Sequence, residues 1–191
     1  LLFPEAPRQL PTPPKTTPIV FGFVGGRNIP NVVGLKKLLQ LIVEDPGPRE
    51  FRLLVAGSVT ELLSEQTLGD IEKKVGDIVG LLGFVEDIEG FYEQIHCAVV
   101  PISVGTGVNV KFLDAASRGL PILSTSIGSK GTGSEAEEHR MASIEDLYES
   151  MKALTPKQLP QMRQTSTALS GALRRRHERE LMALLGQKSP V

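Results

Sequence analysis

The sequence predicts an α/β fold in which a parallel sheet of about six strands carries helices on both faces. Short apolar runs alternate along the chain with segments that have the spacing of helices. Strands that are buried on both sides read as continuous apolar runs, and an alternation of strands and helices is typical of a parallel sheet. The 191 residues, 40% of them hydrophobic, are enough for one such domain with a sizeable core.

Five apolar runs are the predicted strands. In chain order they are IVFGFVG (residues 19–25), FRLLVAG (51–57), DIVGLLGFV (77–85), CAVVPI (97–102) and PILSTS (121–126). A sixth, weaker strand is expected near residues 139–142, because Ser143 with Glu145 and Asp146 behind it resembles the start of another helix. Segments between the runs, such as NVVGLKKLLQLIVEDPG, have helical spacing, and this one ends in Pro and Gly as helices do.

Composition divides the chain into three parts. Residues 1–18 contain six prolines, which predicts an extended linker. Because the chain starts at Leu1 and has no signal-peptide pattern, we expect a piece of a longer protein that begins inside this linker. Residues 19–154 are the predicted ligand-binding domain. Residues 155–191 predict a helical segment with one apolar stripe, formed by Met162, Leu169, Leu173, Leu181 and Leu184.

Charge and cysteine content exclude several classes of protein. The net charge is −1, so no overall field attracts nucleic acid or an anionic membrane, and an anion site has to be built locally. A single cysteine, Cys97, excludes an internal disulfide, and three scattered histidines argue against a zinc cluster. A reducing, cytoplasmic setting is therefore expected. No apolar run approaches the roughly 20 residues that span a bilayer, so we expect no transmembrane segment.

The stretch SVGTGVNVKFLD, residues 103–114, is the most informative candidate site. It follows a predicted strand, and ligands of open parallel sheets bind where strands end and helices begin. With a helix that begins near Gly107, the helical period divides the residues between two sides. Val108, Phe112, Ala115 and Ala116 face the core, and Gly107, Lys111, Asp114 and Arg118 form a polar face.

This polar face suits a phosphate next to a diol. The amides of the loop and the positive end of the helix dipole favour an anion, and Lys111 adds a full charge. Asp114 accepts hydrogen bonds from hydroxyls. Phosphate and diol together are what a nucleotide sugar offers.

Two other loops are predicted at the same edge of the sheet. In GGRNIPN, residues 25–31, two glycines let a phosphate approach the backbone, Arg27 offers a bidentate contact and Asn31 begins the next helix. A tight turn with a surface arginine is the alternative. In GFVED, residues 83–87, backbone groups near Gly83 can meet the edge of a base, and Phe84 packs either against that base or in the core. Neither the P-loop pattern nor the dinucleotide-binding glycine fingerprint occurs.

The residues PISVGTGVNVKFLDAASRGLPILSTSIGSKGT, 101–132, resemble the group 1 glycosyltransferases of the GT-B fold, specifically their C-terminal donor-binding domain. FVGGRNIPN, residues 23–31, is similar to the first strand and turn of that family. Phe84 and FYEQIHCAVVPI, residues 91–102, look like its base-binding region and the following strand. The resemblance covers roughly residues 19–146 and implies that residues 19–154 form a Rossmann-like domain that binds a nucleotide sugar.

The resemblance implies retaining transfer of a sugar from a UDP-, GDP- or ADP-sugar, with no bound metal and no other cofactor. Arg27 and Lys111 would stabilise the leaving diphosphate. Asp114 would hold the ribose hydroxyls, and the backbone near Gly83 and Phe84 would meet the base. The donor-binding residues that it implies are Gly25, Gly26, Asn31, Gly83, Phe84, Gly105, Thr106, Gly107, Val108 and Asp114.

The sequence departs from the family pattern at two places. The family often has two glutamates eight positions apart, and here Thr106 and Asp114 stand in those positions. The lysine that usually follows the first-loop arginine is also missing, since Val32 and Val33 occupy that region, so more of the diphosphate charge falls on Lys111.

The resemblance also implies a partner, the N-terminal GT-B domain of the same chain, which would hold the acceptor and provide any peripheral contact with a membrane. Alone, the fragment should bind the donor weakly and transfer nothing. One alternative is a non-catalytic module of the same fold that binds a nucleotide or a partner. Another is a sugar-nucleotide 2-epimerase, for which the sequence has no convincing acid and base pair.

Overall fold

The computed structural model describes residues 18–45, 47 and 50–184. Apart from Pro18, the predicted proline-rich linker lies outside the described residues, as does the end of the C-terminal segment, 185–191. Five parallel strands form one sheet in the order β3-β2-β1-β4-β5. Their bounds are Ile19–Val24 for β1, Phe51–Ala56 for β2, Val79–Gly83 for β3, Cys97–Val100 for β4 and Ile122–Ser124 for β5.

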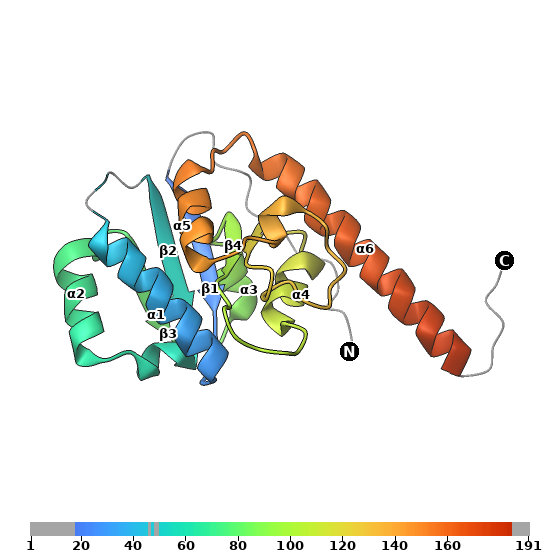
Figure 1. Cartoon of the computed structure of the whole chain (residues 1–191), viewed down its shortest axis with the longest axis horizontal. Helices are drawn as coiled ribbons and strands as arrows, with labels where there is room; N and C mark the ends of the chain where they lie inside the picture. The colour runs from blue at the N-terminus through green and yellow to red at the C-terminus, as the bar shows by residue number, and fades with distance from the viewer. Residues whose placement is uncertain (1–17, 46, 48–49, 185–191) are drawn as a thin grey trace.

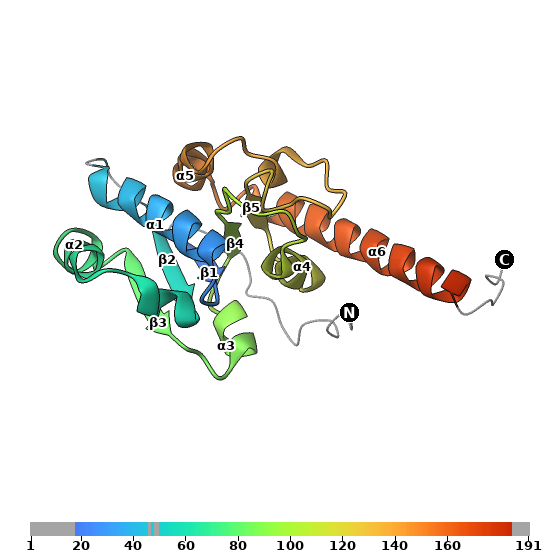
Figure 2. The same cartoon turned by 60° about the horizontal axis from the view of Figure 1, so that its bottom comes forward.

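Helices cover both faces of this sheet (Figures 1 and 2). One face carries α1 (Ile29–Glu44), α2 (Glu65–Val75) and α5 (Ile144–Ala153). The other carries α3 (Ile88–Tyr92), α4 (Val110–Ser117) and much of α6 (Leu159–Leu184). Two short 3-10 helices, η1 (Ser58–Leu62) and η2 (Glu137–His139), lie in the connections. The predicted α/β class, parallel sheet and two helical layers are confirmed.

The alternation of side chains along β4 shows how the sheet separates two apolar cores. Cys97 and Val99 belong to the core under α1, α2 and α5, whereas Ala98 and Val100 belong to the core under α3 and α4. All four residues are buried, because successive side chains of a strand point to opposite faces and both faces are covered. This explains why the strands read as unbroken apolar runs.

The prediction of a sixth strand at residues 139–142 is wrong. Only one residue pairs there: Met141 forms an isolated parallel bridge with Thr125, with hydrogen bonds to Ser124 and Ser126 on either side. The pairing stops because Ser143 already caps α5, its hydroxyl accepting from the amide of Asp146 at 3.0 Å. The predicted start of α5 at Ser143 is therefore correct, and too few residues remain between η2 and α5 to form a strand.

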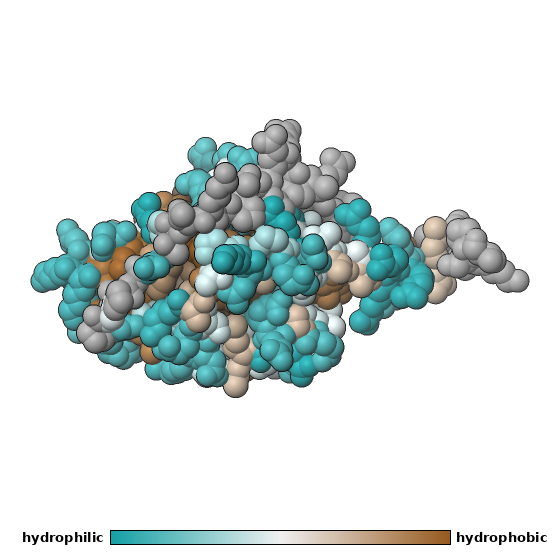
Figure 3. Space-filling model, turned by 90° about the horizontal axis from the view of Figure 1, so that it is seen from above, coloured by the Kyte–Doolittle hydropathy of each residue, from teal (hydrophilic) through white to brown (hydrophobic). Residues whose placement is uncertain are grey.

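The helix α6 extends beyond the rest of the molecule (Figure 1). Met162 is buried and Leu169 half-buried, but Leu181 is exposed. The predicted apolar stripe is thus covered only along the first part of the helix. Figure 3 shows that hydrophilic residues dominate the face of the molecule seen from above. No helix among the described residues is long and apolar enough to cross a membrane.

Candidate functional site

A cavity of about 450 Å³ opens at the carboxyl edge of the sheet, between the start of α1 and the loop before α4. It brings together six of the predicted site residues, namely Asn31, Gly105, Thr106, Gly107, Val108 and Lys111. A cavity of similar volume, about 440 Å³, lies between η2, α5 and α6, and none of the predicted site residues lines it. The first cavity is therefore the candidate site.

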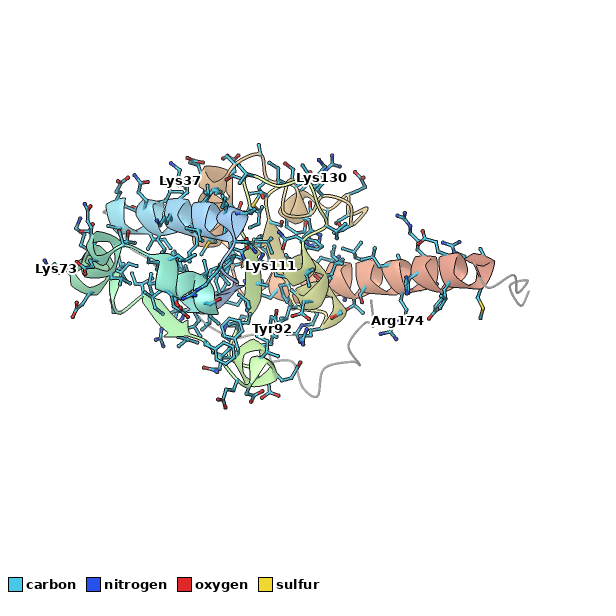
Figure 4. The ribbon with its side chains drawn as sticks, turned by 90° about the horizontal axis from the view of Figure 1, so that it is seen from below. Lys37, Lys73, Tyr92, Lys111, Lys130 and Arg174 are labelled. Atoms are coloured by element: carbon cyan, nitrogen blue, oxygen red, sulfur yellow. The ribbon has the colours of Figure 1, made fainter. Side chains whose placement is uncertain are left out.

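Lys111 is the charged residue in the lining of this cavity. It lies on the first turn of α4, at the centre of Figure 4, between α1 and α4. Its Nζ donates to Oδ1 of Asn31 at 2.7 Å and to Oδ1 of Asn109 at 3.0 Å, and it lies 5.7 Å from the centre of the Phe23 ring. Among the described residues its ammonium has no carboxylate partner.

Burial lowers the pKa of Lys111 to about 8, because the charged form loses hydration. At neutral pH the side chain is still mostly protonated. The cavity consequently contains a positive charge whose contacts are two neutral amides and an aromatic ring. An anion that enters the cavity would be a charge partner for Lys111.

The loop before α4 provides polar backbone groups beside this charge. The N–H groups of Gly105, Thr106, Gly107 and Val108 make no hydrogen bond within the described part of the chain. Gly105 has φ 139°, a conformation that favours glycine. Free amides at the start of a helix favour a bound anion.

The helix begins later than predicted, at Val110 instead of near Gly107, with Asn109 at the N-cap. Val108 therefore lies in the loop and is 50% exposed, so the prediction that it anchors the helix in the core is wrong. Phe112, Ala115 and Ala116 are buried as predicted. The Asn109 side chain makes no capping hydrogen bond and instead accepts from Lys111.

Arg27 and the glycine turn lie outside the lining of the cavity. The side chain of Arg27 is 59% exposed and forms an ion pair with Glu61 of η1. The amide of Gly25 donates to Ala56 O at 3.0 Å, so part of this turn is occupied by contacts within the sheet. Gly26 O accepts from the side chain of Asn31 at 3.0 Å, which links the turn to the cavity.

Asp114 also lies outside the lining, in a group of polar residues that joins α3 and α4. Its carboxylate accepts from the Tyr92 hydroxyl at 2.7 Å and pairs with Arg118, which pairs also with Glu89. Burial, together with the charge of Asp114, raises the pKa of Tyr92. Arg118 was expected on a polar face, but it is only 5% exposed and stacks on the Tyr92 ring at 4.4 Å.

Sequence reasoning missed Glu89 and Tyr92, because they meet Arg118 and Asp114 only through the packing of α3 on α4. The four-residue spacing of Asp114 and Arg118 on one helix was the available signal, since residues so spaced are neighbours on a helix.

Phe84 follows β3 at the carboxyl edge of the sheet. Its side chain is 74% exposed, so the interpretation of Phe84 as a core residue is wrong. Gly83, with φ 66°, ends the strand, and its carbonyl accepts from Gly57 N at 2.6 Å. The exposed ring is available for a ligand. No group of three or more His, Cys, Asp or Glu residues that could hold a metal ion occurs in the part of the chain that the structure describes.

Comparisons with solved structures show related folds. The chain matches the crystal structure of TarM with a TM-score of 0.63 at 14% identity, over 91% of this chain and 34% of that one. It matches HepE (Alr3699) of Anabaena, crystallised with UDP, with a TM-score of 0.64 at 12% identity, over 83% and 44%. A third match is the C-terminal domain of the group 1 glycosyltransferase LpcC from Francisella tularensis, with a TM-score of 0.59 at 16% identity, over 85% and 87%.

The chain thus spans only about a third to a half of the length of TarM and HepE. A search of curated protein sequences found no match. A family model described as "Glycosyl transferases group 1" matches residues 18–155, which include every strand of the sheet and the whole candidate site. The chain belongs to the group 1 glycosyltransferases.

Proposed function

We propose that this chain is the donor-binding part of a glycosyltransferase that takes a sugar from a nucleotide diphosphate donor, with retention of configuration and without a bound metal. The observation that carries the proposal is the environment of Lys111. Its ammonium is held by two neutral amide oxygens, in a cavity whose loop has four unpaired N–H groups.

The chemistry requires this kind of environment. As the bond between the sugar and the diphosphate breaks, negative charge grows on the leaving diphosphate, and groups that stabilise this charge accelerate the reaction. Lys111 would provide a full charge, and the amides of residues 105–108 and the N-terminus of α4 would provide partial charges. Because these groups are already oriented, little reorganisation would be needed in the transition state.

The remaining site residues have roles in this proposal. Asp114 would accept from the ribose hydroxyls, with Tyr92 and Arg118 fixing its orientation. The exposed ring of Phe84 would pack on the base, next to the backbone of Gly83. Gly25 and Gly26 would let the phosphates approach the turn after β1. Arg27 would contribute only after it leaves Glu61.

UDP is the first nucleotide to test, because it is present in the structure of HepE, whose fold is similar. In the proposal, the acceptor binds to an N-terminal domain, since TarM and HepE extend well beyond the part that this chain matches. The chain alone should therefore bind a nucleotide without transferring sugar.

A non-catalytic nucleotide-binding module is the second candidate. Two observations favour it: Thr106, with no carboxylate, lines the cavity where the family often has a glutamate, and Arg27 is already paired with Glu61. The two candidates share the nucleotide site and differ in the transfer reaction.

Calorimetric titration of the chain with UDP, GDP and ADP tests the site. We expect saturable binding of at least one nucleotide, reduced about tenfold or more in Lys111→Gln, because a charged hydrogen bond is lost. EDTA should leave the affinity unchanged. Binding that survives both Lys111→Gln and Asp114→Asn would refute the site, and loss of binding with EDTA would refute the metal-free proposal.

Incubation of the protein that includes an N-terminal domain with UDP-sugars and a panel of acceptors separates the two candidates. Product formation with the anomeric configuration of the donor supports the retaining transferase. Nucleotide binding with neither transfer nor donor hydrolysis supports the module.

A further inference from the structure

A buried amide, Asn31, connects Lys111 to the turn after β1. The residue is only 3% exposed. Its Oδ1 accepts from Lys111 Nζ at 2.7 Å, and its Nδ2 donates to Gly26 O at 3.0 Å. Its backbone N–H donates to Oδ1 of Asn28, the N-cap of α1, at 3.0 Å. Both ends of the side-chain amide are therefore in use.

These contacts fix the orientation of the amide. A carbonyl oxygen such as Gly26 O accepts hydrogen bonds and cannot donate them, so it selects the NH₂ end of Asn31. The oxygen end is then left facing Lys111. An aspartate in this position would bring an oxygen next to Gly26 O and would cancel the charge of Lys111.

The neutrality of the partners distinguishes Lys111 from the arginines nearby. Arg27 pairs with Glu61, and Arg118 pairs with Asp114 and Glu89. A lysine ammonium has three N–H donors, and Asn31 and Asn109 accept from it in the structure. Neutral acceptors hold the ammonium in place and leave its positive charge uncancelled.

We propose that Asn31 is a positioning residue, which aims the ammonium of Lys111 into the cavity as an uncancelled charge and couples it to the turn at Gly26. The inference rests on the proposed function, because it assigns Asn31 to the diphosphate site of that function. Asn31 takes part through Lys111 and the turn, and it needs no contact of its own with the donor.

Two substitutions should shift the pKa of Lys111 in opposite directions. Asn31→Asp keeps the shape but places a carboxylate next to the ammonium, which raises the pKa of Lys111. Asn31→Ala removes an acceptor that stabilises the charged form, which lowers it. NMR titration of the Lys111 side chain, assigned with Lys111→Gln, measures both shifts. A residue that merely fills space would leave this pKa unchanged.

Calorimetry with UDP then measures the consequence. At pH 7, Asn31→Asp should weaken UDP binding about tenfold or more, since the carboxylate competes with the diphosphate for Lys111. Gln40→Glu is the matched control, because it makes the same change from amide to carboxylate at an exposed position of the same helix, away from the cavity. Its UDP affinity should stay within about twofold of the wild type.

The outcomes separate the two proposals. If the wild type binds UDP and Lys111→Gln does not, the proposed function stands. In that case, an unchanged UDP affinity in both Asn31→Asp and Asn31→Ala overturns the role of Asn31. If the wild type binds no nucleotide, the proposed function fails and so does the part of this inference that depends on it. The contact itself is then judged by NMR, where an unchanged pKa of Lys111 in both variants overturns it. Far-UV circular dichroism identifies a variant that does not fold, and the other variant then decides.

Discussion

Replacement of Gly34 by alanine tests the contact that holds the site loop against α1. A Cβ atom at Gly34 would lie 1.8 Å from the carbonyl oxygen of Pro101, whereas real Cβ atoms essentially never approach another atom within 3.0 Å. Pro101 directly follows β4 and leads into the loop of the candidate site. The clash is with backbone, so no side-chain rotation relieves it.

The expected cost follows from two opposing effects. Alanine in place of glycine within a helix normally stabilises by about 1 kcal/mol. Overpacking of a well-packed interior typically costs about 1–3 kcal/mol, and a clash with backbone lies at the upper end of this range or beyond it. We therefore expect Gly34→Ala to lower the free energy of unfolding by about 2 kcal/mol or more, and Tm by roughly 4–8 °C for a domain of this size.

Urea denaturation followed by circular dichroism measures this change. Gly69→Ala is the matched control, because Gly69 lies inside α2 and a Cβ there would meet nothing within 4 Å. The control should gain about 0.5–1 kcal/mol. If Gly34→Ala is stabilised like Gly69→Ala, α1 does not approach Pro101 as described, and the arrangement of Asn31 against Lys111 is also wrong.

Three further predictions concern the charged and aromatic residues of the site. Because the pKa of Lys111 is lowered to about 8, its charged fraction falls from about nine-tenths at pH 7 to about one-tenth at pH 9. The UDP affinity measured by calorimetry should therefore fall about tenfold between these pH values. A UDP affinity that does not change with pH would contradict the role of Lys111 as the cation of the site. Arg118→Met should destabilise the fold by about 1–2 kcal/mol in urea denaturation, because it leaves the half-buried carboxylate of Asp114 and the more exposed one of Glu89 without a charged partner. A change below about 0.5 kcal/mol would show that the ion pairs contribute little. Because the Phe84 ring is exposed, Phe84→Ala should change the free energy of unfolding by less than about 0.5 kcal/mol but should weaken UDP binding. A large decrease in the free energy of unfolding would instead place this ring in the core.

The strands were predictable because burial on both faces leaves a clear pattern in the sequence. The start of α5 was predictable for a local reason, since residues that cap a helix act within three or four positions of the chain. The start of α1 was predicted at Asn31, but the helix begins at Ile29 with Asn28 as its N-cap. The start of α4 was also predicted at the wrong residue. Helical spacing gives the period of the apolar residues but does not say at which residue the helix begins, and Val108 fits the period although it lies in the loop.

The partners of the site residues were predictable only in part. Asn31 and Lys111 were each placed at the ligand edge, but the hydrogen bond between them joins residues 80 positions apart and depends on how closely α1 approaches α4. The same holds for Arg118, which lies within helical reach of Asp114 but meets Glu89 and Tyr92 through packing alone. The sequence indicates which residues share an edge, and packing decides which of them touch.

The distribution of charge at this edge of the sheet distinguishes Lys111 from the other cations near the site. Arg27 and Arg118 are cations that the fold has already paired with carboxylates, and Arg118 is buried besides. A half-buried lysine without a carboxylate partner raises the free energy of the folded state, because its charge loses hydration without gaining an opposite charge. Such a cost is understandable where an anion is to bind, since the anion then provides the missing partner. The unfavourable environment of Lys111 is thus the physical reason to expect a phosphate there.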